Sequence, residues 1–140
     1  MIKKGFTCSC FDLLHAGHVK MLQDARNQCD YLIVGLQTDP TIDRPDTKNK
    51  PIQTMEERQT MLSAIRFIDE IVIYNTEGQL YEYLRDNPPD VRILGTDYKG
   101  KDFTGKDLDI DIYYHKRDHD WSTTNLRKRI TKEENKKRLH

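Results

Sequence analysis

The chain has 140 residues, and its 23 Lys and Arg balance its 23 Asp and Glu, so the formal net charge is +0. This length fits one domain. The balanced charge argues against a general polyanion binder, and we expect no nucleic-acid partner. No run approaches the roughly 18 apolar residues of a membrane helix, and the N-terminus lacks the apolar stretch of a secretory signal. We therefore predict a cytoplasmic protein that does not bind membranes.

The three cysteines, Cys8, Cys10 and Cys29, are odd in number and lie in apolar stretches. Reduced, buried thiols fit this pattern and agree with a cytoplasmic location. A Cys-x-Cys pair with one further cysteine has poor spacing for a structural zinc site. We therefore predict no protein-bound metal site.

Short apolar runs alternate with helical patterns along the whole chain. Strands are predicted, in chain order, over 5–10, 31–36, 70–74 and 91–94, with a fifth where Leu108, Ile110 and Ile112 alternate with aspartates. Helices are predicted over 19–28, 55–66 and 78–86, and a last one, capped by Ser122 or Thr123, runs into 127–130. The second helix opens with Thr54 and Glu57 at the spacing of a capping box.

This alternation of strands and helices predicts one Rossmann-like α/β domain over residues 1–130. Its sheet is expected to have five strands, mostly parallel, with helices on both faces. Residues 131–140 are almost all charged, and we expect a solvated tail there. Sheets of this kind bind ligands beyond the carboxyl ends of their strands, so motifs at those ends carry the most weight.

Two histidines, His15 and His18, follow the first predicted strand and flank Gly17, where a helix begins. Backbone N–H groups and the dipole at a helix start favour an anion, and a glycine lets a phosphate approach the backbone closely. Imidazoles donate hydrogen bonds to phosphate oxygens, and a protonated imidazole adds charge. The segment therefore predicts phosphate chemistry.

Segment 9–18 resembles the G-x-F-D-x-x-H-x-G-H motif of the cytidylyltransferase-like nucleotidyltransferases. Segment 95–98 and Arg117, followed by 122–124, agree with later family motifs in order and spacing. Within the family the chain is most similar to glycerol-3-phosphate cytidylyltransferases, with ethanolamine-phosphate, choline-phosphate and heptose-phosphate enzymes as relatives. The resemblance implies transfer of a nucleotidyl group from a triphosphate to a phosphomonoester, with Mg²⁺ on the triphosphate. It also implies a homodimer.

The resemblance assigns roles to individual residues. It implies that the catalytic residues are His15, His18, Lys50 and Arg117. It implies that the nucleotide is bound by Cys10, Phe11, Gly17, His18, Gly95, Asp97, Arg117, Ser122 and Thr123. It implies that the acceptor substrate is bound by Asp12, Lys48 and Arg66. From the residues alone, the two lysines also fit a solvated loop, Arg66 an exposed helix end, and Asp97 a turn. Arg58 fits either a helical ion pair or a nucleotide contact.

Three positions depart from the family pattern. Ser9 replaces the first glycine of the motif, and segment 118–121 lacks the usual Thr and Gly. Trp121 in that segment either stacks on the nucleobase or packs beneath the last helix. Leu80 stands where glycerol-3-phosphate enzymes have a substrate-binding lysine, which weakens the case for that acceptor.

We therefore predict transfer of CMP from CTP to a small alcohol or polyol phosphate, glycerol 3-phosphate or similar. An adenylyltransferase acting on ATP and a sugar phosphate such as heptose 1-phosphate is the alternative. An inactive nucleotide sensor is the second alternative. No general base is required, because a phosphomonoester is already largely dianionic near neutral pH.

Overall fold

The computed structural model describes residues 1–139, which form a five-stranded sheet in the order β3-β2-β1-β4-β5. Every strand pair in it is parallel. The strands are β1 (Lys4–Ser9), β2 (Tyr31–Gln37), β3 (Glu70–Tyr74), β4 (Val91–Gly95) and β5 (Asp111–His115). The helices are α1 (Ala16–Asn27), α2 (Met55–Ser63), α3 (Glu77–Asp86), α4 (Thr123–Arg138) and the short 3-10 turn η1 (Thr96–Tyr98). The predicted Rossmann-like α/β fold is confirmed.

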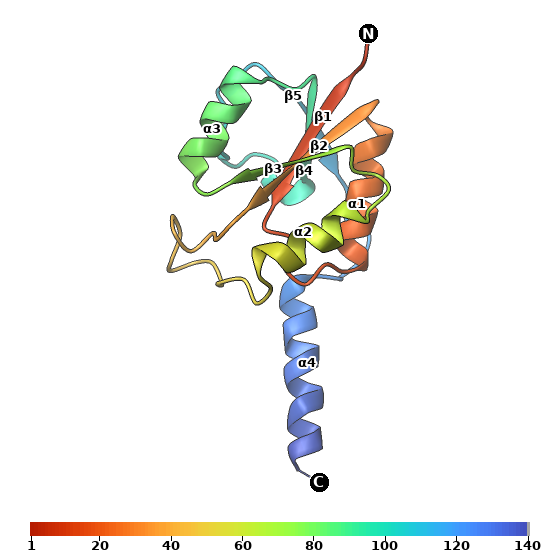
Figure 1. Cartoon of the computed structure of the whole chain (residues 1–140), viewed down its shortest axis with the longest axis vertical. Helices are drawn as coiled ribbons and strands as arrows, with labels where there is room; N and C mark the ends of the chain where they lie inside the picture. The colour runs from red at the N-terminus through yellow and green to blue at the C-terminus, as the bar shows by residue number, and fades with distance from the viewer. Residues whose placement is uncertain (140) are drawn as a thin grey trace.

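Helices cover both faces of the sheet because the interior strand β2 is apolar on both sides. Alternate residues of β2 point to opposite faces. Leu32, Val34 and Leu36 join one buried cluster, with Leu22 of α1 and Leu62 of α2. Ile33 joins a second cluster, which contains residues of α3. Figure 1 shows α1 and α2 on one side of the sheet and α3 on the other.

The strand order reverses at β1, between β2 on one side and β4 on the other. β1 pairs with β2 over six residues, but its register with β4 covers only Gly5 and Phe6. Beyond Phe6, the hydroxyl of Thr7 bridges the two strands by donating to the carbonyl of Ile93 at 3.1 Å. The carboxyl ends of β1 and β4 therefore diverge at the switch point of the sheet, where ligands of such folds bind.

Two predicted boundaries differ from the structure. β5 is an edge strand, as expected, but it begins at Asp111. Leu108 and Ile110 instead precede it and pack against the buried cluster on the α3 face. The predicted charged tail is helical as far as Arg138, because α4 continues through it. Lys, Arg and Glu are good helix formers, so the tail extends the helix.

Figure 1 shows α4 projecting away from the body of the molecule, and none of its residues is buried. The last residue, His140, lies outside the described part of the predicted tail. Of the helices in residues 1–139, none has the length and apolar character needed to span a membrane.

Candidate functional site

The two histidines of the HxGH segment cap helix α1 through their own side chains. His15 is the N-cap residue, and its Nδ1 accepts a hydrogen bond from the backbone N–H of Gly17 at 3.0 Å. Nδ1 of His18 accepts the backbone N–H of His15 at 3.1 Å. The ring centroids lie 3.8 Å apart. Because a neutral imidazole has one N–H, both rings carry it on Nε2, where it is free to donate to a ligand.

Both imidazoles are neutral at neutral pH. Burial, with a smaller contribution from the neighbouring His15, lowers the pKa of His18 to about 4. Burial also lowers the pKa of His15, with smaller contributions from His119 and Arg117. The pair therefore presents two fixed N–H donors to a phosphate rather than positive charges.

The loop between β1 and α1 is held in an unusual conformation. Phe11 and Leu13 have φ angles of 48° and 51°, in the left-handed region that side chains other than glycine rarely adopt. The carboxylate of Asp12 between them accepts the backbone N–H groups of Ile52 and Gln53 at 3.0 and 2.9 Å. These bonds hold a strained loop whose shape sets the start of α1.

Asp12 was predicted to bind the acceptor, but the structure commits its carboxylate to the protein. Besides the two N–H groups, it pairs with Arg127 of α4 at 3.2 Å. Its side chain is buried and lines neither of the two cavities described below. Asp12 therefore joins the loop between β1 and α1 to the base of α4, and both of its carboxylate oxygens are engaged within the protein.

A cavity of about 240 Å³, which we call the histidine cavity, lies between the N-termini of α1 and α4. It brings together eight residues predicted from three distant segments: His15, Gly17, His18, Gly95, Asp97, Arg117, Ser122 and Thr123. Ser122 caps α4 as predicted, accepting the backbone N–H of Asn125 at 3.0 Å. Two helix N-termini therefore face one cavity, an arrangement that favours an anion.

The sequence did not indicate His115, which lines the same cavity from the end of β5. Its Nδ1 lies 2.7 Å from a carboxylate oxygen of Asp24, which also accepts the hydroxyl of Tyr113. Nε2 of His115 is buried and has no hydrogen-bond partner in the protein. Since Asp24 lies 91 residues away, only the folded chain reveals this pair.

Trp121 lies in the wall of the histidine cavity, stacked on His119 with ring centroids 4.7 Å apart. The amine of Lys20 lies 5.4 Å from the centre of the Trp121 ring. With 42% of its surface exposed, Trp121 is not a packing residue beneath α4. Its position suits the first of the two interpretations, stacking on a nucleobase.

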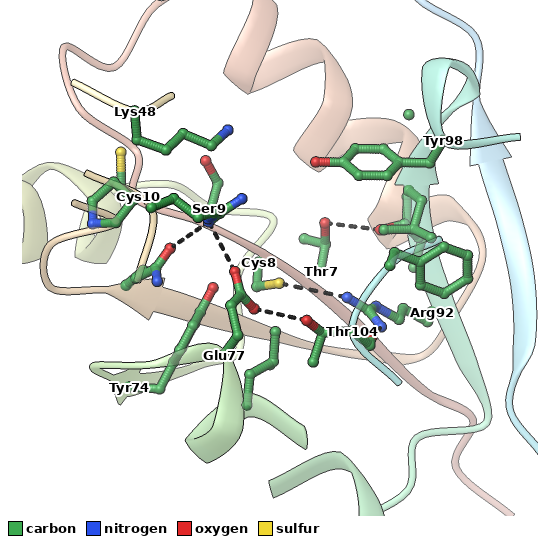
Figure 2. A pocket seen from close by; sticks show the side chains of 18 of the residues that line it. Thr7, Cys8, Ser9, Cys10, Lys48, Tyr74, Glu77, Arg92, Tyr98 and Thr104 are labelled. Carbon is green, nitrogen blue, oxygen red and sulfur yellow. Dashed lines mark hydrogen bonds and ion pairs between the residues drawn. The ribbon is translucent and has the colours of Figure 1, made fainter. Parts of the chain in front are cut away.

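A larger cavity of about 410 Å³, which we call the arginine cavity, opens on the α3 side of β1 (Figure 2). Met21 and Gly95 line both cavities, so the two adjoin at the end of β4. Of the predicted site residues, only Cys10, Lys48 and Gly95 line the arginine cavity. The polar residues that the sequence did not indicate are mainly Arg44, Tyr74, Glu77, Arg92, Tyr98 and Thr104.

Polar side chains in the arginine cavity form a connected network (Figure 2). Glu77 pairs with Arg44 at 2.8 Å and accepts the hydroxyl of Thr104 at 3.1 Å. Burial raises the pKa of both Cys8 and Tyr74. These two groups are therefore uncharged, and the charges of the network reside on its arginines and Glu77.

Three further predicted residues lie outside both cavities. Lys50 is exposed and lies 3.5 Å from Asp39, and Arg66 is exposed with its guanidinium 5.0 Å from the ring of Phe67. The side chain of Phe11 is buried in the core. None of the three lines either cavity.

Arg58 makes neither of the contacts considered for it. It is buried, and its guanidinium donates to the backbone carbonyls of Cys10, Gln37, Thr38 and Gln53 at 2.7 to 3.2 Å. It therefore ties together the carboxyl ends of β1 and β2. Arg58 positions the site without facing it.

Two capped helix starts, neutral imidazole donors and a cavity at the switch point of a parallel sheet are features of a phosphate-binding α/β domain. Residues 6–129 match the family model described as cytidylyltransferase-like, and the chain belongs to this family. Within residues 1–139, no group of three or more His, Cys, Asp or Glu side chains is arranged to hold a metal ion.

Curated relatives include proteins called bifunctional protein HldE. That of Aliarcobacter butzleri is 39% identical over 92% of this chain and 27% of its own length. That of Wolinella succinogenes is 44% identical over 74% of this chain and 22% of its own length. The chain thus spans about a quarter of the length of these relatives.

Two solved structures share the fold. A lipopolysaccharide core biosynthesis protein from Thermoplasma volcanium has a TM-score of 0.59 and 21% identity, covering 94% of this chain and 88% of its own. Pantoate-beta-alanine ligase from Francisella tularensis, complexed with beta-gamma ATP and beta-alanine, has a TM-score of 0.65 and 18% identity. It covers 90% of this chain and 65% of its own. At these identities, the likeness concerns the fold alone.

Proposed function

We propose that this chain is an adenylyltransferase that joins ATP to a sugar phosphate and releases pyrophosphate. This was the alternative interpretation of the sequence, and the HldE relatives support it better than transfer of CMP to glycerol 3-phosphate. Leu80 also argues against glycerol 3-phosphate, since it is a buried apolar part of the arginine-cavity wall. The relatives lend no support to CTP as the nucleotide.

The observation that carries the proposal is the pairing of neutral imidazole donors with two helix N-termini around one cavity. In this proposal the triphosphate lies in the histidine cavity. Its β- and γ-phosphates meet the N-terminus of α4 at Ser122 and Thr123. The Nε2–H groups of His15 and His18 donate to the α-phosphate, where negative charge crowds in the transition state.

The acceptor would lie in the arginine cavity, which adjoins the histidine cavity at Gly95. An oxygen of its dianionic phosphate attacks the α-phosphorus in line, and the bond to the bridging α–β oxygen breaks. Pyrophosphate leaves with that electron pair. Because the attacking phosphate is already a dianion, no proton has to be removed from it. Lys48, on the cavity wall, offsets the charge of the incoming phosphate. Mg²⁺ would arrive on the triphosphate as part of the substrate.

Pyrophosphate release tests this assignment directly. We expect release with Mg²⁺, ATP and a sugar 1-phosphate, and little release with CTP and glycerol 3-phosphate. The opposite preference would restore the cytidylyltransferase interpretation. Tight binding of ATP, with no pyrophosphate released in the presence of any acceptor, would point to the inactive sensor.

Single substitutions test the roles of the histidines. Because each supplies a donor to the transition state, His15→Ala and His18→Ala should each lower kcat by about 10²-fold or more. Lys137→Ala is the control, since Lys137 is exposed and lines neither cavity. It should leave kcat and KM within about twofold of wild type. Near-normal turnover in both histidine variants would contradict the mechanism.

We further propose, on the family resemblance alone, that the protein is a cytoplasmic homodimer. Sedimentation at micromolar concentration tests the dimer. A mass equal to that of one chain would refute it.

A further inference from the structure

Arg92, the second residue of strand β4, is a buried cation that lines the arginine cavity. Its side chain donates to the carbonyl of Thr104, and Nη2 lies 4.0 Å from Sγ of Cys8. The Nε–H is buried and has no hydrogen-bond partner. No carboxylate of residues 1–139 forms an ion pair with it. Such burial is unfavourable unless something compensates the charge.

A second buried arginine shows what a purely structural role requires in this protein. Arg58 is 2% exposed and Arg92 is 3% exposed, and neither has a carboxylate partner. Arg58 compensates with four backbone carbonyls reached by Nε, Nη1 and Nη2, and it lines neither cavity. Arg92 has one carbonyl, one weakly accepting sulfur and the ring of Phe103, whose centre lies 5.2 Å from the guanidinium carbon, and it lines a cavity. Its unused donors therefore point to a ligand.

The carboxylate that shares Thr104 with Arg92 is already engaged. Glu77 pairs with Arg44 and accepts the hydroxyl of Thr104 (Figure 2). The cavity wall contains three cations, Arg44, Lys48 and Arg92, against two acids, Glu77 and Asp102. The missing partner of Arg92 is therefore best supplied by an anion from outside the protein.

That anion is not the phosphate that reacts. The guanidinium of Arg92 lies beside Cys8, whereas the phosphate-binding loop begins at Cys10. The Cα atoms of Cys8 and Cys10, two residues apart in extended chain, are separated by about 7 Å, the length of a sugar ring with its substituents. Figure 2 shows Lys48, the cation assigned to the reacting phosphate, and Arg92 on opposite sides of the cavity.

We propose that the acceptor carries a second anionic group, a carboxylate or a phosphate, at the end away from its reacting phosphate, and that Arg92 binds this group. The proposal rests on the proposed function, because it places the acceptor in the arginine cavity. It narrows the substrate class to sugar phosphates with two anionic ends. A planar guanidinium suits both anions, since it can donate two parallel hydrogen bonds to either.

Direct binding tests the inference without any turnover. Glucose 1-phosphate, glucuronic acid 1-phosphate and glucose 1,6-bisphosphate are titrated calorimetrically into the nucleotide-free wild type. We expect one or both of the doubly anionic compounds to bind about tenfold or more tightly than glucose 1-phosphate. The relative affinity of the acid and the bisphosphate identifies the preferred anion. Equal affinities, or no binding of any of the three, would overturn the proposal.

Variants of Arg92 assign the effect to this side chain. Arg92→Met keeps the packing volume but removes the donors, and it should reduce the preference to within about twofold. Arg92→Lys keeps the charge without the paired donors and should retain part of the preference. A full preference in a folded Arg92→Met chain would contradict the assignment. Should Arg92→Met not fold, the titrations of Arg92→Lys and of the wild type still test whether Arg92 binds the second anionic group.

The two proposals fail separately. Absence of pyrophosphate release from ATP with any acceptor would count against the adenylyltransferase and leave the titrations intact. Pyrophosphate release from ATP, together with equal binding of the sugar phosphates with one and with two anionic groups, would keep the adenylyltransferase and remove the second anion site.

Discussion

Each histidine of the HxGH segment uses one ring nitrogen to hold the backbone and leaves the other for a ligand. Because His15 and His18 both accept at Nδ1, the helix start fixes the tautomer of the groups that donate to the phosphate. Their neutrality is the result of burial next to each other. The same burial makes the folded chain sensitive to acid.

The free energy of unfolding should fall as the pH is lowered from about 6.5 to about 4. The pKa of His18 is about 4 in the folded chain and near 6.5 when unfolded, so only the unfolded chain takes up the proton in this window. The contribution is about 3 kcal/mol by linkage. Urea unfolding of wild type and His18→Asn at several pH values measures it. If the variant loses as much stability as wild type over this window, His18 is not the group responsible.

Asp12→Asn should destabilise the fold by about 3 kcal/mol, the usual effect of breaking a buried ion pair. The amide cannot accept two backbone N–H groups and balance Arg127 as the carboxylate does. Asp46→Asn, at an exposed loop position, is the control and should change stability by no more than about 0.5 kcal/mol. Urea denaturation compares the two variants. Similar values for both would mean that Asp12 does not hold the loop.

At the residue scale, the sequence predicted the site residues that lie where a helix begins. His15, Gly17, Ser122 and Thr123 start helices, and the structure brings them to one cavity. A charged residue within the apolar run of β4 was the available signal for Arg92. The interaction of His115 with Asp24 left no signal, because it depends on packing between distant segments. The motif match did not reveal that Asp12 bonds the backbone and Arg127, because a match gives a residue type without its partners.

The secondary-structure elements were predicted where local chemistry determines them. The capping box is confirmed, with Thr54 accepting from Glu57 N and Glu57 accepting from Thr54 N. The uniformly apolar run of β2 predicted a strand covered on both faces. The start of β5 could not be predicted, because its register with β4 determines which residues pair. Leu108 and Ile110 alternate with aspartates because their side chains pack against the buried cluster just before the strand begins.

Helix α4 should be stable only near its base. An isolated helix of this length is marginal in water, and no residue of α4 is buried. Truncation after Ile130 keeps Arg127 and should change the free energy of unfolding by no more than about 0.5 kcal/mol. Truncation after Leu126 removes the partner of Asp12 and should destabilise the chain markedly. Equal effects of the two truncations, measured by urea unfolding, would show that the outer helix supports the fold.

At the scale of the whole molecule, the two cavities lie at one end of the sheet and adjoin at the end of β4. Rossmann-like architecture and strand direction predicted that end as the site. The division into two cavities was not predicted, because it depends on how far β1 and β4 diverge and on the side chains that fill the gap. Packing of this kind has no signature in a single sequence.

The single tryptophan reports on one cavity alone. Trp121 lines the histidine cavity and not the arginine cavity. ATP should therefore change its fluorescence, whereas glucose 1,6-bisphosphate without nucleotide should leave the emission unchanged. Titrations followed by emission intensity measure both. A change with the sugar bisphosphate as large as that with ATP would contradict the separate placement of the two substrates.

The N-terminus and the outer end of α4 lie at opposite extremes of the molecule (Figure 1). Strand β1 leads from the N-terminus to the catalytic loop over six residues, about 20 Å of extended chain. At the other end, α4 holds Arg138 at the tip of a projecting rod. A reporter protein or an affinity tag joined to either end would thus sit clear of both cavities. The domain is therefore well shaped for use as a cassette, either immobilised by its outer helix or linked through its first strand to a second enzyme.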